Sequence, residues 1–112
     1  MINTLKMLEN DLTNSLSDKK SQSTLNISDV VENYEGYIRD FKSAVALLSK
    51  AIKADDKITI QCALTRVRIS SLNLSNSYQD IIDDVMLINS HDSWTEIPDD
   101  YQIPEHYDYP SK

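Results

Sequence analysis

The chain is 112 residues long, which fits a single domain, and it contains one Gly, three Pro and one Cys. An all-β fold of this length would need several glycine-rich or Asn-Gly turns, and a disulfide framework would need more cysteines, so the composition favours helices and excludes a disulfide scaffold. The net charge of −7 and the pI near 4.6 disfavour direct binding to nucleic acid or to an anionic membrane, because both need a basic surface, and they favour a basic protein partner.

The first predicted element is a short helix over residues 3–17, which Asn3 or Thr4 could cap. Its apolar stripe consists of leucines at steps of three and four residues, namely Leu5, Leu8, Leu12 and Leu16. Residues 18–27 are mostly polar, and such a segment buries too little apolar surface to offset the entropy that is lost on ordering. We therefore expect a mobile linker between this helix and the next.

A long second helix is predicted over residues 28–54, with Ser28 as its cap and Lys50 and Lys53 near its negative end. One apolar row alternates steps of three and four: Ile27, Val30, Tyr34, Tyr37, Phe41, Ala44, Leu48 and Ala51. A second row runs beside it at seven-residue spacing: Val31, Ile38, Val45 and Ile52. A face this wide must contact more than one neighbouring helix.

The third predicted helix follows a short, largely polar connection at residues 53–57, where Asp55 or Asp56 can cap it. Residues 57–69 alternate apolar and polar side chains, which makes a strand a competitor there. We favour a helix over residues 57–89, because no Gly or Pro interrupts about thirty residues of three-four rhythm. That rhythm comprises Ile60, Leu64, Val67, Ser71, Leu74, Tyr78, Ile81, Val85 and Ile88.

The last 22 residues, 91–112, carry five of the seven net negative charges, whereas the preceding residues are near balance with twelve acidic and ten basic side chains. Pro98 and Pro104 interrupt regular structure in this tail. We predict that its acidic and aromatic side chains bind a partner: Asp92, Trp94, Glu96, Asp99, Asp100, Tyr101, Glu105, Tyr107, Asp108 and Tyr109. The sequence leaves open the alternative of a structural tail that packs on the hairpin through Trp94, Ile97 and Ile103.

Few residues could carry catalysis. Cys62 lacks a nearby base, since both histidines lie in the tail, and we expect it to be a small buried side chain. Asp80, Asp83 and Asp84 place two carboxylates one helical turn apart, but no Glu-x-x-His motif accompanies them, so we interpret them as a solvated helix face. No phosphate, dinucleotide or zinc motif can be written, which predicts no enzyme activity, no cofactor and no metal site.

Basic side chains gather towards the predicted hairpin end: Arg39, Lys42, Lys50, Lys53, Lys57, Arg66 and Arg68. They could receive the acidic tail or an acidic partner, although a mixed, soluble surface is the simpler interpretation.

The sequence therefore predicts an all-α protein in which a helical domain, residues 1–90, contains a short N-terminal helix and a long antiparallel hairpin, and residues 91–112 form an acidic tail. Two copies could complete a four-helix bundle over the wide apolar face, which predicts a homodimer. Charges in the first 16 residues interrupt any signal-peptide core, and no apolar run approaches the roughly 20 residues that cross a bilayer. We therefore expect a cytoplasmic protein.

The predicted function is that of an inhibitor or immunity-type protein that blocks a basic partner, such as a toxin or a nucleic-acid enzyme. The alternative is an assembly protein or secretion-chaperone adaptor, in which the apolar stripe of the hairpin receives an amphipathic helix from a partner or from a second copy. In that case the tail would serve solubility.

Overall fold

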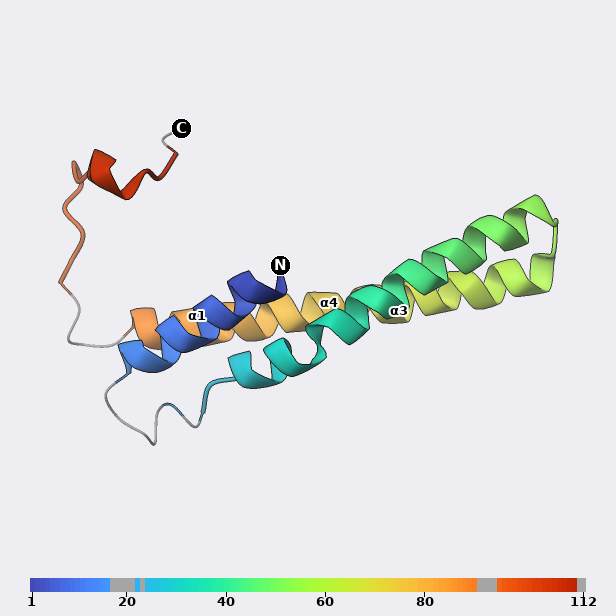
Figure 1. The fold of residues 1–112 in the computed structure, drawn as a ribbon, viewed down its shortest axis with the longest axis horizontal. Helices are drawn as coiled ribbons and strands as arrows, with labels where there is room; N and C mark the ends of the chain where they lie inside the picture. Colours follow the sequence, from blue (N-terminus) through green and yellow to red (C-terminus); the bar gives the residue numbers. More distant parts are fainter. Residues whose placement is uncertain (17–21, 23, 91–94, 111–112) are drawn as a thin grey trace.

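The computed structural model describes residues 1–16, 22, 24–90 and 95–110. Helix α1 spans Ile2–Ser15, α3 spans Ile27–Lys53, α4 spans Lys57–Asn89, and a 3-10 turn, η1, spans Glu105–Tyr107. Figure 1 shows α3 and α4 as a long antiparallel hairpin, with α1 beside its open end and antiparallel to α3. The molecule measures 59 × 37 × 22 Å. The predicted all-α fold, with a short N-terminal helix, a long hairpin and a tail, is confirmed.

Helix α1 packs on the hairpin through the predicted leucine stripe. Leu5, Leu12 and Leu16 are buried and join one apolar cluster with Ile27, Val30 and Tyr34 of α3 and Ile88 of α4. The predicted caps, Asn3 and Thr4, are wrong, because the helix begins at Ile2 and Met1 precedes it without a side-chain cap. The apolar stripe, rather than a cap, therefore holds α1 in place.

The segment between α1 and α3 was predicted to be a mobile linker, and residues 17–21 and 23 lie outside the described part of the chain. Within it, the side-chain amide of Gln22 donates to the carbonyl oxygens of Thr13 and Leu16, at the end of α1. At its end, Leu25 packs on the apolar cluster and Ile27 is buried in it. The described residues of this segment are thus bound to the helices that they join.

A residue of α4 caps the amino end of α3. The two carboxylate oxygens of Asp84 accept hydrogen bonds from the backbone N–H of Asn26, at 2.8 and 2.9 Å, and one of them accepts from the N–H of Ile27, at 2.7 Å. Asp84 is 2 % exposed, so its interpretation as part of a solvated face is wrong. The predicted cap, Ser28, is also wrong, because it lies inside the first turn. Free N–H groups at a helix start attract a carboxylate, and these bonds offset the cost of burying one.

Helix α4 begins at the predicted place, after a turn in which Asp55 adopts a left-handed conformation with φ 52°. The carboxylate of Asp56 accepts from the backbone N–H of Thr59 at 3.1 Å and from its hydroxyl at 2.7 Å. Both bonds lower the pKa of Asp56, and the bond from the hydroxyl of Thr59 has the larger effect. Residues 57–69 are helical, so the competing strand interpretation is excluded. Asp56 confirms the predicted cap.

The seam between α3 and α4 follows the predicted row fully on one helix and in part on the other. On α3, Ile27, Val30, Tyr34, Ala44 and Ala51 are buried as expected. On α4, alternate members of the predicted row are buried or half-buried as expected: Ile60, Val67, Leu74, Ile81 and Ile88. The other four are exposed, and the residue before each of them is buried instead: Ala63, Ser70, Ser77 and Asp84 in place of Leu64, Ser71, Tyr78 and Val85. Small side chains at the contact let two helix axes approach closely, which explains why they, and not the larger residues, occupy the seam.

Two regions of the helical domain differ in how many helices they contain. We call residues 1–38 and 73–90 the body and residues 39–72 the arm. Every residue of the apolar cluster lies in the body, where α1 covers the hairpin. The arm consists of α3 and α4 alone, as Figure 1 shows.

Candidate functional site

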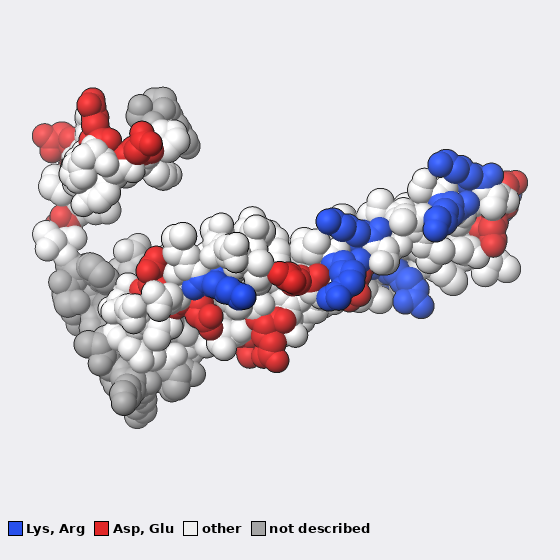
Figure 2. Space-filling model, viewed as in Figure 1, with Lys and Arg blue, Asp and Glu red and all other residues white. Residues whose placement is uncertain are grey.

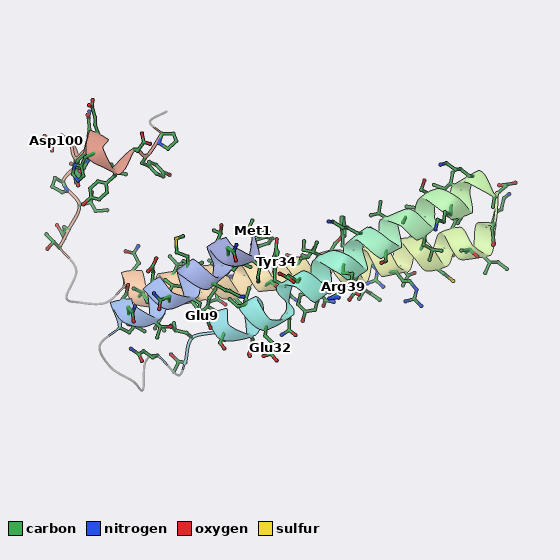
Figure 3. The ribbon with its side chains drawn as sticks, in the orientation of Figure 1. Met1, Glu9, Glu32, Tyr34, Arg39 and Asp100 are labelled. Carbon is green, nitrogen blue, oxygen red and sulfur yellow. The ribbon has the colours of Figure 1, made fainter. Side chains whose placement is uncertain are left out.

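The described part of the tail, residues 95–110, is exposed except for the half-buried Pro104. In Figure 1 it leaves the open end of the hairpin and turns away from the helices, and Figure 3 places Asp100 far from the body. Ile97 and Ile103 are 82 % and 57 % exposed. The structure therefore gives no support to the alternative in which these two residues pack on the hairpin, and Trp94 lies outside the described residues.

Two turns shape the tail, and each begins at a proline. The backbone N–H of Tyr101 donates to the carbonyl of Pro98 at 3.0 Å, and the N–H of Tyr107 donates to the carbonyl of Pro104 at 3.1 Å. Proline has no N–H, but the first residue of such a turn contributes only its carbonyl, so proline is compatible with that position. In the second turn, the rings of His106 and Tyr107 stack with centroids 4.2 Å apart. The turns give the backbone of the tail a defined local shape and leave its acidic and aromatic side chains exposed.

Eight of the ten predicted binding residues lie on this described segment, all of them exposed: Glu96, Asp99, Asp100, Tyr101, Glu105, Tyr107, Asp108 and Tyr109. Asp92 and Trp94 lie outside the described residues. The segment contains five carboxylates and no Lys or Arg, and Figure 2 shows its acidic groups without a basic neighbour on the visible face. A field of one sign with exposed rings is suited to attract and hold a cation-rich surface.

The arm carries the opposite charge. It contains seven basic residues and three acidic ones, whereas all other residues together contain four basic and fifteen acidic ones. The net charge of −7 therefore divides into +4 on the arm and −11 elsewhere. Figure 2 shows most of the basic side chains over the arm and most of the acidic ones over the body and the tail. The sequence alone identifies these cations but favours a mixed surface. The position of the start of α1 on the hairpin is what separates them from the acidic body.

The second apolar row of α3 changes its exposure where the body meets the arm. Val31 and Ile38 are half-buried and pack on the cluster that contains the leucines of α1. Val45 and Ile52 continue the row at the same seven-residue spacing but are 43 % and 58 % exposed. The predicted wide face is thus covered over its first half only.

A surface depression of about 570 Å³ lies where α1 begins and its cover of the hairpin stops. Its lining includes Met1, Tyr34, Ile38, Arg39 and Lys42, and Figure 3 shows the labelled Met1, Tyr34 and Arg39 in this part of the hairpin. The hydroxyl oxygens of Tyr34 and Tyr78 are 2.6 Å apart. This hydrogen bond, followed by burial, raises the pKa of Tyr34 to about 12.

Among the described residues, no catalytic groups converge on the tail or on the arm. Cys62 is exposed, so the expectation of a buried side chain is wrong; Ala63, the next residue, takes the buried position. Within the described residues, no three His, Cys, Asp or Glu side chains are placed to hold a metal ion. A search of the same residues found no helix with the length and apolar character needed to cross a membrane.

Comparison of the chain with known protein families, with curated proteins and with solved structures gave no match.

Proposed function

We propose that this protein is a cytoplasmic, non-enzymatic binding protein whose acidic, aromatic tail engages a basic protein partner, as an inhibitor or immunity-type protein does. One observation carries the proposal: the carboxylates and tyrosines of residues 95–110 are exposed and free of the helical body. A basic toxin or a nucleic-acid enzyme is the class of partner that this chemistry fits, because the tail presents the charge that such a partner binds in nucleic acid.

The two kinds of side chain have separate roles in this proposal. Carboxylates such as Asp99 and Asp100 steer the encounter, and charge complementarity of this kind raises association rates by about 10- to 1000-fold at low salt. Tyrosine rings such as Tyr101 and Tyr107 supply rigid contact area that can enter pockets of the partner, so they govern dissociation. The helical body is the scaffold that carries the tail.

The test is quantitative affinity capture from extracts of the source cells, with the full chain as bait. The proposal predicts a captured basic protein whose retention is lost with Asp99→Lys combined with Asp100→Lys, and with Tyr101→Ala. The matched control is Asp11→Lys combined with Glu32→Lys, which makes the same charge change at exposed positions of the body. Equal capture by all baits would show that the tail is not the contact surface.

Once a partner is identified, its association and dissociation rates separate the two roles. The charge reversal should chiefly slow association and reduce its dependence on salt, whereas Tyr101→Ala should chiefly speed dissociation. Inhibition of the activity of the partner by the full chain then tests the inhibitor assignment directly.

A helical adaptor or secretion-chaperone protein is the second candidate function. The observation that favours it is the exposed apolar row on the arm, Val45 and Ile52, which continues the row that α1 covers in the body. In this function the arm is the working surface and the tail maintains solubility.

A further inference from the structure

One apolar face of the hairpin, which we call the groove, contacts α1 in the body and is exposed at Val45, Ile52 and Leu64 in the arm. In the body, Val31 and Ile38 pack on the apolar cluster that the leucines of α1 join. Since Val45 and Ile52 repeat the same position on α3 one and two heptads later, they lie on the same face of that helix. The depression of about 570 Å³, lined by Met1 and Ile38, marks the point at which α1 begins and the exposed part of the groove starts.

Helix α4 supplies the other wall of this groove. Tyr78 follows Ser77 of the seam, and its hydroxyl meets that of Tyr34, which lines the depression, so Tyr78 lies on the side of the seam where the groove is. Leu64 precedes Tyr78 by two heptads, so it lies on the same face of α4 but in the arm, where it is 51 % exposed. Val45, Ile52 and Leu64 are therefore the apolar floor that the arm offers to an additional helix.

The length of the open groove matches the helix that fills its other half. Helix α1 has 14 residues, or about 21 Å at 1.5 Å per residue. The arm contains the last 15 residues of α3, from Arg39 to Lys53, or about 22 Å. A helix of about four turns therefore fits the arm as α1 fits the body.

Basic residues border this floor. Lys42 lies three residues before Val45, Arg68 lies four residues after Leu64, and Lys57 lies one heptad before Leu64, so all three adjoin the groove. Of the three acidic residues of the arm, Asp40 lines a different depression, with Leu47 and Ile69, and Asp56 is engaged as the cap of α4. The groove is thus apolar at its centre and positively charged at its margin.

We propose that the arm binds an acidic amphipathic helix of another protein, about 14 residues long, whose apolar stripe covers Val45, Ile52 and Leu64. The site gives the second candidate function its binding surface and the chemistry of its partner, and it does not depend on the tail. A second copy is a poorer occupant, because it would bring two arms of charge +4 together. The tail of this chain is also a poorer occupant, because Pro98 and Pro104 prevent it from forming a helix of that length.

The probe for this site is a fluorescein-labelled 14-residue peptide with leucines at the spacing of Leu5, Leu8 and Leu12 and with Glu at its outward positions. The control peptide is identical except for Lys at those outward positions. With the full-length protein at low salt, fluorescence anisotropy should show affinity at least about tenfold higher for the acidic peptide, and added salt should weaken it.

The site is located with two double variants of the full chain. Ile52→Ser with Leu64→Ser removes the apolar floor and should weaken binding of the acidic peptide about tenfold or more. Ile69→Ser with Leu72→Ser changes two similarly exposed residues on other faces of the arm and should leave binding unchanged. Because all four residues are exposed, thermal melting should remain close to that of the unchanged chain in both cases.

Three results would overturn the proposal. The first is equal binding of the acidic and basic peptides, and the second is binding that Ile52→Ser with Leu64→Ser does not alter. The third is occupation of the groove by this chain itself. A peptide of residues 95–110 would then displace the probe at a concentration equal to that of the probe. Alternatively, sedimentation equilibrium would show a dimer that Ile52→Ser with Leu64→Ser dissociates. The arm variants leave the tail intact. A negative result with them counts against the arm site only, whereas Asp99→Lys with Asp100→Lys tests the tail site only.

Discussion

The body and the arm are built from the same two helices with the same seven-residue repeat, yet they bury different amounts of it. In the body, Val31 and Ile38 lie under α1, and Asp84 ties the start of α3 to the end of α4. In the arm, Val45 and Ile52 occupy equivalent positions but are 43 % and 58 % exposed. The comparison teaches that a heptad pattern specifies which residues share a face, whereas a third helix decides whether that face is buried.

The largest expected contrast between the two regions comes from one isoleucine in each. Ile27 is 1 % exposed in the body, so Ile27→Ala should lower the free energy of unfolding by about 2–5 kcal/mol. Ile52→Ala, on the same helix but in the arm, should change it by less than about 0.5 kcal/mol. Urea denaturation followed by circular dichroism measures both. Equal losses would break the comparison, since they would mean that the arm is covered in solution.

The next largest loss of stability is expected on removing the cap at the open end of the hairpin. Asp84→Ala leaves the backbone N–H groups of Asn26 and Ile27 without their carboxylate acceptor, which should cost about 1.5–3 kcal/mol. Asp83→Ala, an exposed neighbour, is the control and should cost less than about 0.5 kcal/mol. Faster hydrogen exchange at Asn26 and Ile27 in the first variant would assign the loss to the cap; an unchanged unfolding curve would refute its role.

A smaller effect is expected from the tyrosine pair at the border of the body. The pKa of Tyr34 is about 12 in the folded protein against a reference value of 10.0, so its contribution to stability is complete below pH 10 and is lost as the pH rises towards 12. Tyr34→Phe should remove this high-pH loss and should cost about 0.5–1.5 kcal/mol at neutral pH, through the missing hydrogen bond.

The titration of the tyrosines by ultraviolet absorbance checks this assignment. Tyr34→Phe should abolish a late-titrating group, whereas Tyr101→Phe in the tail should leave that group in place. If the late phase survives Tyr34→Phe, the hydrogen bond to Tyr78 is not its cause.

The smallest effect on stability should come from removing the tail. Because Ile97 and Ile103 are exposed, deletion of residues 91–112 should move the melting temperature by no more than about 2 °C while abolishing capture of the basic partner. A packed tail would instead give a shift of several degrees, and a deleted form that still captures the partner would refute the tail site.

The element boundaries and the rows of α3 could be predicted because periodicity and charge at helix ends are local properties of the chain. The buried face of α4 could be predicted only in part, because steps of three and four that start at Ile60 describe two rows equally well, and these rows share every second residue. One row contains Leu64, Tyr78 and Val85, and the other contains small or polar residues such as Ala63 and Ser70. Hydrophobicity favours the first row, whereas close approach of two helices selects the second.

The candidate sites show the same division. Composition alone identified the tail as acidic and aromatic, but two prolines are compatible with either a packed or a free segment, so its exposure was not predictable. The basic arm was visible as a cluster of charges in the sequence. Its significance depends on the place where α1 stops, which tertiary packing determines.

The bond between Asp84 and the start of α3 constrains the order in which the chain can fold. Asn26 and Asp84 are 58 positions apart, so the first turn of α3 lacks its acceptor until the last part of α4 has been synthesised. The turn at Asp55 and Asp56, by contrast, closes through neighbours only three to five residues apart. Contacts between near neighbours form before contacts across a long loop. We therefore expect α3 and α4 to pair first at their connection and then towards the open end of the hairpin, with α1 docking last. On this order, the face that carries Val45 and Ile52 forms before α1 has docked on the body.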